Sequence, residues 1–244
     1  MTNADANGLW RIPQTTVPEG RVLELTRLLE SRLREWDSLH SPVCFSTSLA
    51  AEDMVITDAL SRAARSIRIF TLNTGRLHVQ TLSMIPAIQA RYGLGVEACD
   101  PDPQALAHVV EVHGVDGFYD SEEARHACCQ VRKVQVLDRA LAGAQAWITG
   151  VRRGQSTTRT ALELHEWDEQ RRLHKFNPLF DWSDGEVWAY LAHHQVPINP
   201  LHHKGYPSIG CEPCTRAIRQ GEDVRAGRWW WLNQTSKECG LHVK

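Results

Sequence analysis

Residues 42–65 read PVCFSTSLAAEDMVITDALSRAAR, and this stretch combines the patterns of a strand, a loop and a helix. Residues 42–45 form a short apolar run that predicts a buried strand, and residues 46–48 are a polar Ser-Thr-Ser turn. From residue 52 onward, apolar side chains recur three or four positions apart, which is the spacing of an amphipathic helix. The stretch therefore predicts a strand, a loop and a helix in succession.

The same unit recurs along the first two thirds of the chain. Apolar runs and helical spacing predict strands at 67–72, 95–98 and 146–149, and helices at 21–36, 78–92, 103–113 and 121–142. Such alternation is typical of α/β proteins, so we expect a mostly parallel, twisted sheet flanked by helices. Ligands of these sheets bind at the carboxyl ends of the strands. The loops to examine are therefore 46–53, 73–77 and 150–160.

Beyond residue 160 the pattern weakens. Ser183 and Glu186 form a capping-box signature, which predicts a helix that ends near residue 194. From residue 195 onward, proline and glycine are frequent and loops are expected. We expect one nucleotide-binding α/β domain over residues 1–232, with a loop-rich C-terminal segment, and a flexible tail over residues 233–244.

Composition limits the class of protein. The 244 residues are 42% hydrophobic and 23% charged, which is typical of a globular chain. The net charge of −2 argues against a general nucleic-acid-binding surface. Of the 27 basic residues, 22 are arginines, which can bind phosphate or sulfate with two hydrogen bonds. The first fifteen residues lack an apolar run, and no eighteen apolar residues occur together. We therefore expect a cytoplasmic protein without a membrane span.

Seven cysteines in such a chain are better explained as ligands or nucleophiles than as disulfides. Cys211 and Cys214 form a C-x-x-C pair, and Cys128 and Cys129 stand in tandem on an expected helix. Four thiolates suit a [4Fe–4S] cluster, and adjacent helical cysteines point about 100° apart, which suits a bulky cluster better than one small ion. A zinc site and a set of unliganded buried thiols remain alternatives.

The other three cysteines differ in their surroundings. Cys44 and Cys99 fall in apolar strand segments, where a free cysteine is expected to act as a small buried hydrophobic residue. Cys239 lies in the polar tail, two residues after Lys237 and three before His242. These neighbours can lower the pKa of a thiol, so Cys239 is a candidate nucleophile.

Seven motifs together make the sequence resemble a known family. They are FSTSLAAEDM (45–54), NTGRL (73–77), CCQVRKV (128–134), TGVRRGQS (149–156), KFNPLFDW (175–182), GCEPCTR (210–216) and KECGLH (237–242). In this order they resemble the assimilatory adenylyl-sulfate reductases, the iron–sulfur branch of the adenylyl-sulfate and phosphoadenylyl-sulfate reductase family. The resemblance extends from about residue 43 to residue 242.

The resemblance implies a fold of the adenine-nucleotide-hydrolase type and a reaction. The expected activity is thioredoxin-dependent reduction of adenylyl sulfate to sulfite and AMP in sulfate assimilation, through an S-sulfonate on Cys239 as the catalytic residue. It also implies that the four cysteines at 128, 129, 211 and 214 hold a [4Fe–4S] cluster. Electrons would come from thioredoxin or a similar dithiol rather than from the cluster.

The family also implies a substrate site around the loop 46–53. There Ser46 and Ser48 can donate hydroxyl hydrogen bonds to an anion, beside the free N–H groups of the following helix. Lys133, four residues after Cys129, is expected between cluster and substrate. The remaining expected substrate-binding residues are Arg76, Gly150, Arg159, Arg225, Arg228 and His242.

Two departures and three alternatives accompany this interpretation. Asn73 stands where many relatives have aspartate, and Ala50 where glycine is frequent. The alternatives are a phosphoadenylyl-sulfate reductase, a non-catalytic iron–sulfur nucleotide sensor, and an ATP-using adenylyl transferase of related fold, which would carry a glycine-rich SGGxDS loop. Neither departure affects a cysteine or an arginine of the expected site. The sequence leaves homo-oligomer formation open.

Overall fold

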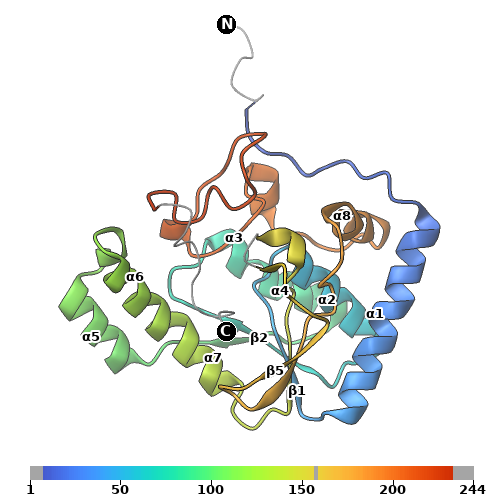
Figure 1. Ribbon diagram of the computed structural model, residues 1–244, viewed down its shortest axis with the longest axis horizontal. Helices are drawn as coiled ribbons and strands as arrows, with labels where there is room; N and C mark the ends of the chain where they lie inside the picture. The colour runs from blue at the N-terminus through green and yellow to red at the C-terminus, as the bar shows by residue number, and fades with distance from the viewer. Residues whose placement is uncertain (1–7, 157–158, 233–244) are drawn as a thin grey trace, which may run out of the picture.

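The computed structural model describes residues 8–156 and 159–232, and its core is a six-stranded sheet (Figure 1). In spatial order the strands are β3 (Glu97–Cys99), β2 (Arg68–Leu72), β1 (Val43–Ser46), β4 (Ala146–Ile148), β6 (Leu173–Phe176) and β5 (His165–Asp168). All neighbouring pairs are parallel except β5 and β6, which are antiparallel. The expected mostly parallel sheet is therefore confirmed.

Helices cover both faces of the sheet. One face carries α1 (Glu19–Leu39), α2 (Ala51–Ala63), α4 (Met84–Tyr92) and α8 (Asp184–His193), whose apolar side chains form one core with Val43 and Phe45 of β1. The other face carries α7 (Gln135–Ala140), where Leu137 packs with Cys44 and Phe70. Alternate residues of β1 thus enter different cores, as the twofold period of a strand requires.

The remaining elements are short or lie at the margins. Helix α6 (Glu122–Cys129) contacts α5 (Pro103–His113), and both lie on the α7 side of the molecule (Figure 1). Short helical turns occur at α3 (Val79–Leu82), Gly117–Tyr119, Arg153–Gln155, Pro200–Lys204 and Glu212–Cys214. In the described part of the chain, no helix has both the length and the apolar character needed to cross a membrane.

Three regions differ from the sequence-based expectation. The helix expected at 78–92 is divided at Ser83, and Pro86 is tolerated because it lies in the first turn of α4. The helix expected at 121–142 contains a π-helical segment, Gln130–Val134, between α6 and α7. Strands β5 and β6 were not expected at all, because each is only four residues long and mixes polar and apolar side chains.

The connections create a crevice beside β1. The chain passes from β1 through α2 to β2 and β3 on one side, and then returns through α5, α6 and α7 to β4 on the other side of β1. The loops that follow β1 and β4 therefore lead away in opposite directions. Such a reversal leaves a ligand-binding crevice at the carboxyl ends of the two strands.

Candidate functional site

A cavity of about 600 Å³ lies at this reversal point. It is large enough for a nucleotide-sized ligand. Seven of the residues expected to bind substrate line it, namely Ser46, Ser48, Lys133, Gly150, Arg159, Arg225 and Arg228. They come from the β1–α2 loop, the π-helical segment, the loop after β4 and the segment before residue 232. The structure thus brings together residues that lie up to 182 positions apart, from 46 to 228.

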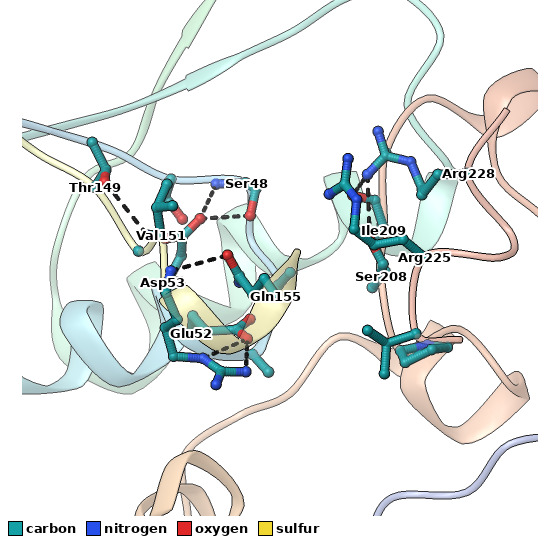
Figure 2. Close-up of a pocket in the computed structure, with 18 of the residues that line it drawn as sticks. Ser48, Glu52, Asp53, Thr149, Val151, Gln155, Ser208, Ile209, Arg225 and Arg228 are labelled. Carbon is teal, nitrogen blue, oxygen red and sulfur yellow. Dashed lines mark hydrogen bonds and ion pairs between the residues drawn. The ribbon is translucent and has the colours of Figure 1, made fainter. Parts of the chain in front are cut away.

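One wall of the cavity is the β1–α2 loop, in which both serine hydroxyls are already held. The indole Nε1 of Trp147 donates to Ser46 Oγ at 2.7 Å. The backbone N–H and the hydroxyl of Ser48 both donate to Asp53 Oδ2 at 2.5 Å (Figure 2). The donors of Ser48, which the sequence suggested for an anionic ligand, therefore face an internal carboxylate in this structure.

Asp53 links the two loops of the crevice. Its side chain lies so close to Gly150 that a Cβ atom at that glycine would come within 3.0 Å of Asp53 Cγ. Burial raises the pKa of Asp53 to about 6, although the hydrogen bonds from Ser48 act in the opposite direction. Sequence reasoning had not singled out this residue. Its only signal was an acidic side chain in the first turn of the helix after the loop.

Beside Asp53, an ion pair fixes the loop after β4. Arg152 is only 4% exposed, and its Nε and Nη2 atoms donate to Glu52 Oε1 at 3.1 and 2.7 Å. Burial alone would raise the pKa of Glu52, but the Arg152 guanidinium holds it below its ordinary value. Arg152 also donates to the Trp182 carbonyl at 2.9 Å and pairs with Asp184. This arginine therefore holds the wall of the cavity together.

The opposite wall carries the cations. Figure 2 shows Arg225 and Arg228 across the cavity from Ser48 and Asp53. The Arg228 guanidinium is held by the Ile209 carbonyl at 3.2 Å and stacks 4.7 Å from the Trp229 ring centroid. Lys133 and Arg159 add two more cations to the lining. Besides Arg152, which is paired with Glu52 and Asp184, four cations line the cavity, and they suit a ligand with a multiply charged anionic group.

Two of the residues expected at the substrate do not appear in this lining. Arg76 pairs with Asp116 at 2.8 Å, donates to the Val115 carbonyl at 2.9 Å, and lies over the Phe118 ring, so it does not line the cavity. His242 lies outside the described residues. The binding roles of both residues stay predictions.

The four cysteines expected to bind a cluster lie in one region beside the cavity, whose lining includes Cys211. Cys211 and Cys214 are buried and pack with Trp229, against which Cys128 also lies. Burial raises the pKa of Cys214 to about 12, and the neighbouring Cys211 and Cys129 add to this effect. Burial likewise raises the pKa of Cys128, again with Cys211 as a neighbour.

The surroundings of these thiols fit a sulfur-rich group. The Nε1 atoms of Trp229 and Trp231 and the Nε of Arg228 are buried without an acceptor among the described residues. Sulfur atoms of an iron–sulfur cluster could accept such hydrogen bonds. In the same part of the chain, no group of three or more Cys, His, Asp or Glu side chains is placed to hold a metal ion. The cluster therefore stays a prediction that the donor set supports.

The other cysteines are scattered. Cys44 is 4% exposed in the core beside α7, as expected, whereas Cys99 is only half-buried at the end of β3. Cys239, the expected nucleophile, lies outside the described residues together with the rest of the tail, 233–244.

Comparison with known proteins agrees with this geometry. The family model described as phosphoadenosine phosphosulfate reductase domain matches residues 42–217. Curated proteins named adenosine 5'-phosphosulfate reductase are 57% identical in Allochromatium vinosum, over 88% of this chain and 82% of that protein, and 49% identical in Neisseria meningitidis, over 96% and 97%.

Solved structures extend the comparison to the fold. A phosphoadenylyl-sulfate reductase from Candida auris in a phosphate complex has a TM-score of 0.66 and 24% identity, over 84% of this chain and all of that one. An FMN adenylyltransferase from Candida glabrata has a TM-score of 0.57 and 14% identity, over 95% of this chain and 83% of that one. Both similarities show the fold alone. The match over residues 42–217 and the high identity to the curated relatives show that the chain belongs to the phosphoadenosine phosphosulfate reductase domain family.

Proposed function

We propose that this chain is an enzyme that reduces adenylyl sulfate to sulfite and AMP in sulfate assimilation. The observation that carries the proposal is the cavity in which Arg225 and Arg228 lie across from the β1–α2 loop and whose lining also includes Lys133. Such an arrangement suits the phosphosulfate of a nucleotide. Curated relatives that are 48–57% identical are named for reduction of this substrate.

The proposed reaction divides the reduction into two displacements. The Cys239 thiolate attacks the sulfur of the bound substrate, the bond between that sulfur and the phosphate oxygen breaks, and AMP leaves with the electron pair. A dithiol of the thioredoxin type then attacks the Cys239 sulfur, and sulfite leaves with the electron pair of the S–S bond. The second thiol of the reductant resolves the mixed disulfide, so the dithiol supplies both electrons.

The residues of the cavity have separate tasks in this scheme. Arg225, Arg228 and Lys133 would hold the anionic group and balance the charge that develops on the leaving phosphate. A [4Fe–4S] cluster, held by Cys128, Cys129, Cys211 and Cys214, would supply a fixed charge behind Lys133. Trp229 lies between these thiols and the cations, with Lys133 5.9 Å and Arg228 4.7 Å from its ring centroid.

The test is anaerobic incubation with adenylyl sulfate in the absence of reductant, followed by intact-mass, iron and labile-sulfide analysis. The wild type should gain one SO₃ group, Cys239→Ser should gain none and release no sulfite, and Cys99→Ser should behave as the wild type. An adduct that persists in Cys239→Ser would refute the assignment of Cys239 as the nucleophile. No adduct in any variant, with cluster iron present, would favour the iron–sulfur sensor.

A phosphoadenylyl-sulfate reductase is the second candidate, because the matching family model carries that substrate in its description. The additional 3′-phosphate would need basic partners of its own. Competition between the two nucleotides in one sulfite-release assay decides between them. Preference for the unphosphorylated ribose supports the proposal.

A further inference from the structure

Trp147 connects β4 to β1 at the floor of the cavity. It is 1% exposed and stands opposite Cys44 in the parallel pairing of the two strands. Ser46 follows Cys44 by two positions, so both side chains point to the same face of the sheet. The Trp147 Nε1 atom donates to Ser46 Oγ at 2.7 Å, and both residues line the cavity.

Two cations fix the Trp147 ring. Arg171 and Lys175 each lie 5.6 Å from its centroid. Arg171 is held in turn by Asp168 at 2.9 Å, and Lys175 by Glu166 at 3.3 Å. Cations near an indole are attracted to its π-electrons, so this arrangement holds the ring in one position. The indole N–H therefore has a defined direction.

This donor limits what the Ser46 hydroxyl can do. A serine hydroxyl has one proton and two acceptor lone pairs, and Trp147 occupies an acceptor position. Among the described residues, Ser46 Oγ makes no other hydrogen bond, so its proton is available to the cavity. Ser48 differs, because its hydroxyl already donates to Asp53. Ser46 is therefore the serine of this loop that can donate to a ligand without giving up an internal bond.

We infer that Trp147 is a positioning residue of the substrate site, which holds the Ser46 hydroxyl with its proton toward an anionic oxygen of the nucleotide. The inference rests on the proposed function and deepens it. Trp147 itself donates to Ser46 rather than to the substrate. Its contribution should therefore disappear when Ser46 has no hydroxyl, whereas a purely structural contribution of the buried ring would remain.

A double-mutant cycle tests this directly. Trp147→Phe and Ser46→Ala should each raise KM for adenylyl sulfate about tenfold, the factor that one hydrogen bond to a charged group contributes, with kcat nearly unchanged. The double variant should show the same KM as Ser46→Ala alone. Losses that multiply to about a hundredfold in the double variant would overturn the inference.

The same cycle is measured with AMP binding, which needs no turnover. If the wild type binds AMP but releases no sulfite, the proposed function is refuted. The coupling energy between Trp147 and Ser46 for binding the nucleotide phosphate can still be measured in that case. If Trp147→Phe lowers the affinity for AMP by the same factor in the wild type and in Ser46→Ala, the inference is refuted.

Two further variants separate positioning from packing. Trp36→Phe removes a buried indole that stacks on Phe176 away from the cavity, and it should lower stability without changing KM. If Trp147→Phe does not fold, benzothienylalanine at position 147 keeps the shape of the ring and removes only the N–H. This replacement should reproduce the tenfold effect, and an unchanged KM would contradict the inference.

Discussion

Replacement of Gly150 by alanine should damage the cavity through Asp53 rather than through lost flexibility. An added Cβ would lie within 3.0 Å of Asp53 Cγ and closer still to its Oδ1 atom, below any ordinary contact. The carboxylate is buried and belongs to helix α2, and we expect it to turn away from the added Cβ and from Ser48. Two hydrogen bonds of 2.5 Å would then be lost.

The magnitude follows from these two bonds. A hydrogen bond to a charged group contributes about 1.5–3 kcal/mol, so Gly150→Ala should lower the free energy of unfolding by about 3–6 kcal/mol. Urea unfolding, followed by tryptophan fluorescence, measures this loss. Gly154→Ala on the same loop is the matched control, because its added Cβ would make only an ordinary contact, 3.5 Å from an Arg152 nitrogen.

The effects of Gly150→Ala and Asp53→Ala on stability should not be additive. Asp53→Ala removes the atoms that clash, so adding Gly150→Ala to it should cost less than about 1 kcal/mol more. A double variant in which the two losses simply add would refute the proposed contact. A Gly154→Ala variant as unstable as Gly150→Ala would instead point to the general stiffness of the loop.

Three other predictions concern the groups around the cavity and the core. Because burial raises the pKa of Asp53 from 3.8 to about 6, the folded state holds its proton more tightly than the unfolded state, and stability should fall by about 3 kcal/mol as the pH rises from about 4 to 6. The Asp53→Asn variant should lack this part of the pH dependence of stability. The free energy of unfolding is measured by urea unfolding at several pH values, and equal slopes against pH in the two proteins would contradict the prediction. Arg152→Met should lower the free energy of unfolding by about 3–5 kcal/mol, because it leaves the buried Glu52 carboxylate unpaired. Adding Glu52→Gln to this variant should recover part of that loss. Tyr190→Phe should lower the free energy of unfolding by about 1–3 kcal/mol, since the hydroxyl of this fully buried residue donates to Asp58 at 2.8 Å and accepts from Arg62 at 2.7 Å. Thermal unfolding measures this loss, with Tyr206→Phe as the control.

Much of the fold could be predicted because burial leaves a periodic pattern. The β1–loop–α2 unit combines an apolar strand with a helix whose apolar side chains recur three or four positions apart in the sequence, so both elements were expected within a few residues of their bounds, although most residues of α2 prove to be buried. Strands β5 and β6 carry no such pattern. His165 and Glu166 of β5, for example, belong to the strand because they pair with β6. No alternation of apolar and polar residues in the sequence marks this strand.

The candidate site divides in the same way. The motifs identified the serines, the cations and the cysteines because each is a chemically distinctive side chain. The sequence could not show that Asp53 accepts the hydrogen bonds of Ser48, or that Trp147 reaches Ser46. The first depends on the backbone conformation of the loop between β1 and α2, and the second on the pairing of β1 with β4, two segments about a hundred residues apart.

The π-helical segment Gln130–Val134 makes the number of residues here as important as their identity. It begins directly after Cys129 and places both Arg132, which donates to the Thr74 carbonyl at 2.6 Å, and Lys133 in buried positions. A π-helical turn holds about one residue more than an α-helical turn, so deletion of one residue here should convert the segment to an ordinary α-helix and leave α7 on the sheet, while Arg132 and Lys133 shift from their buried positions. The one extra residue of this turn therefore sets where the arginine and the lysine lie, and its removal should affect the site more than the packing of α7.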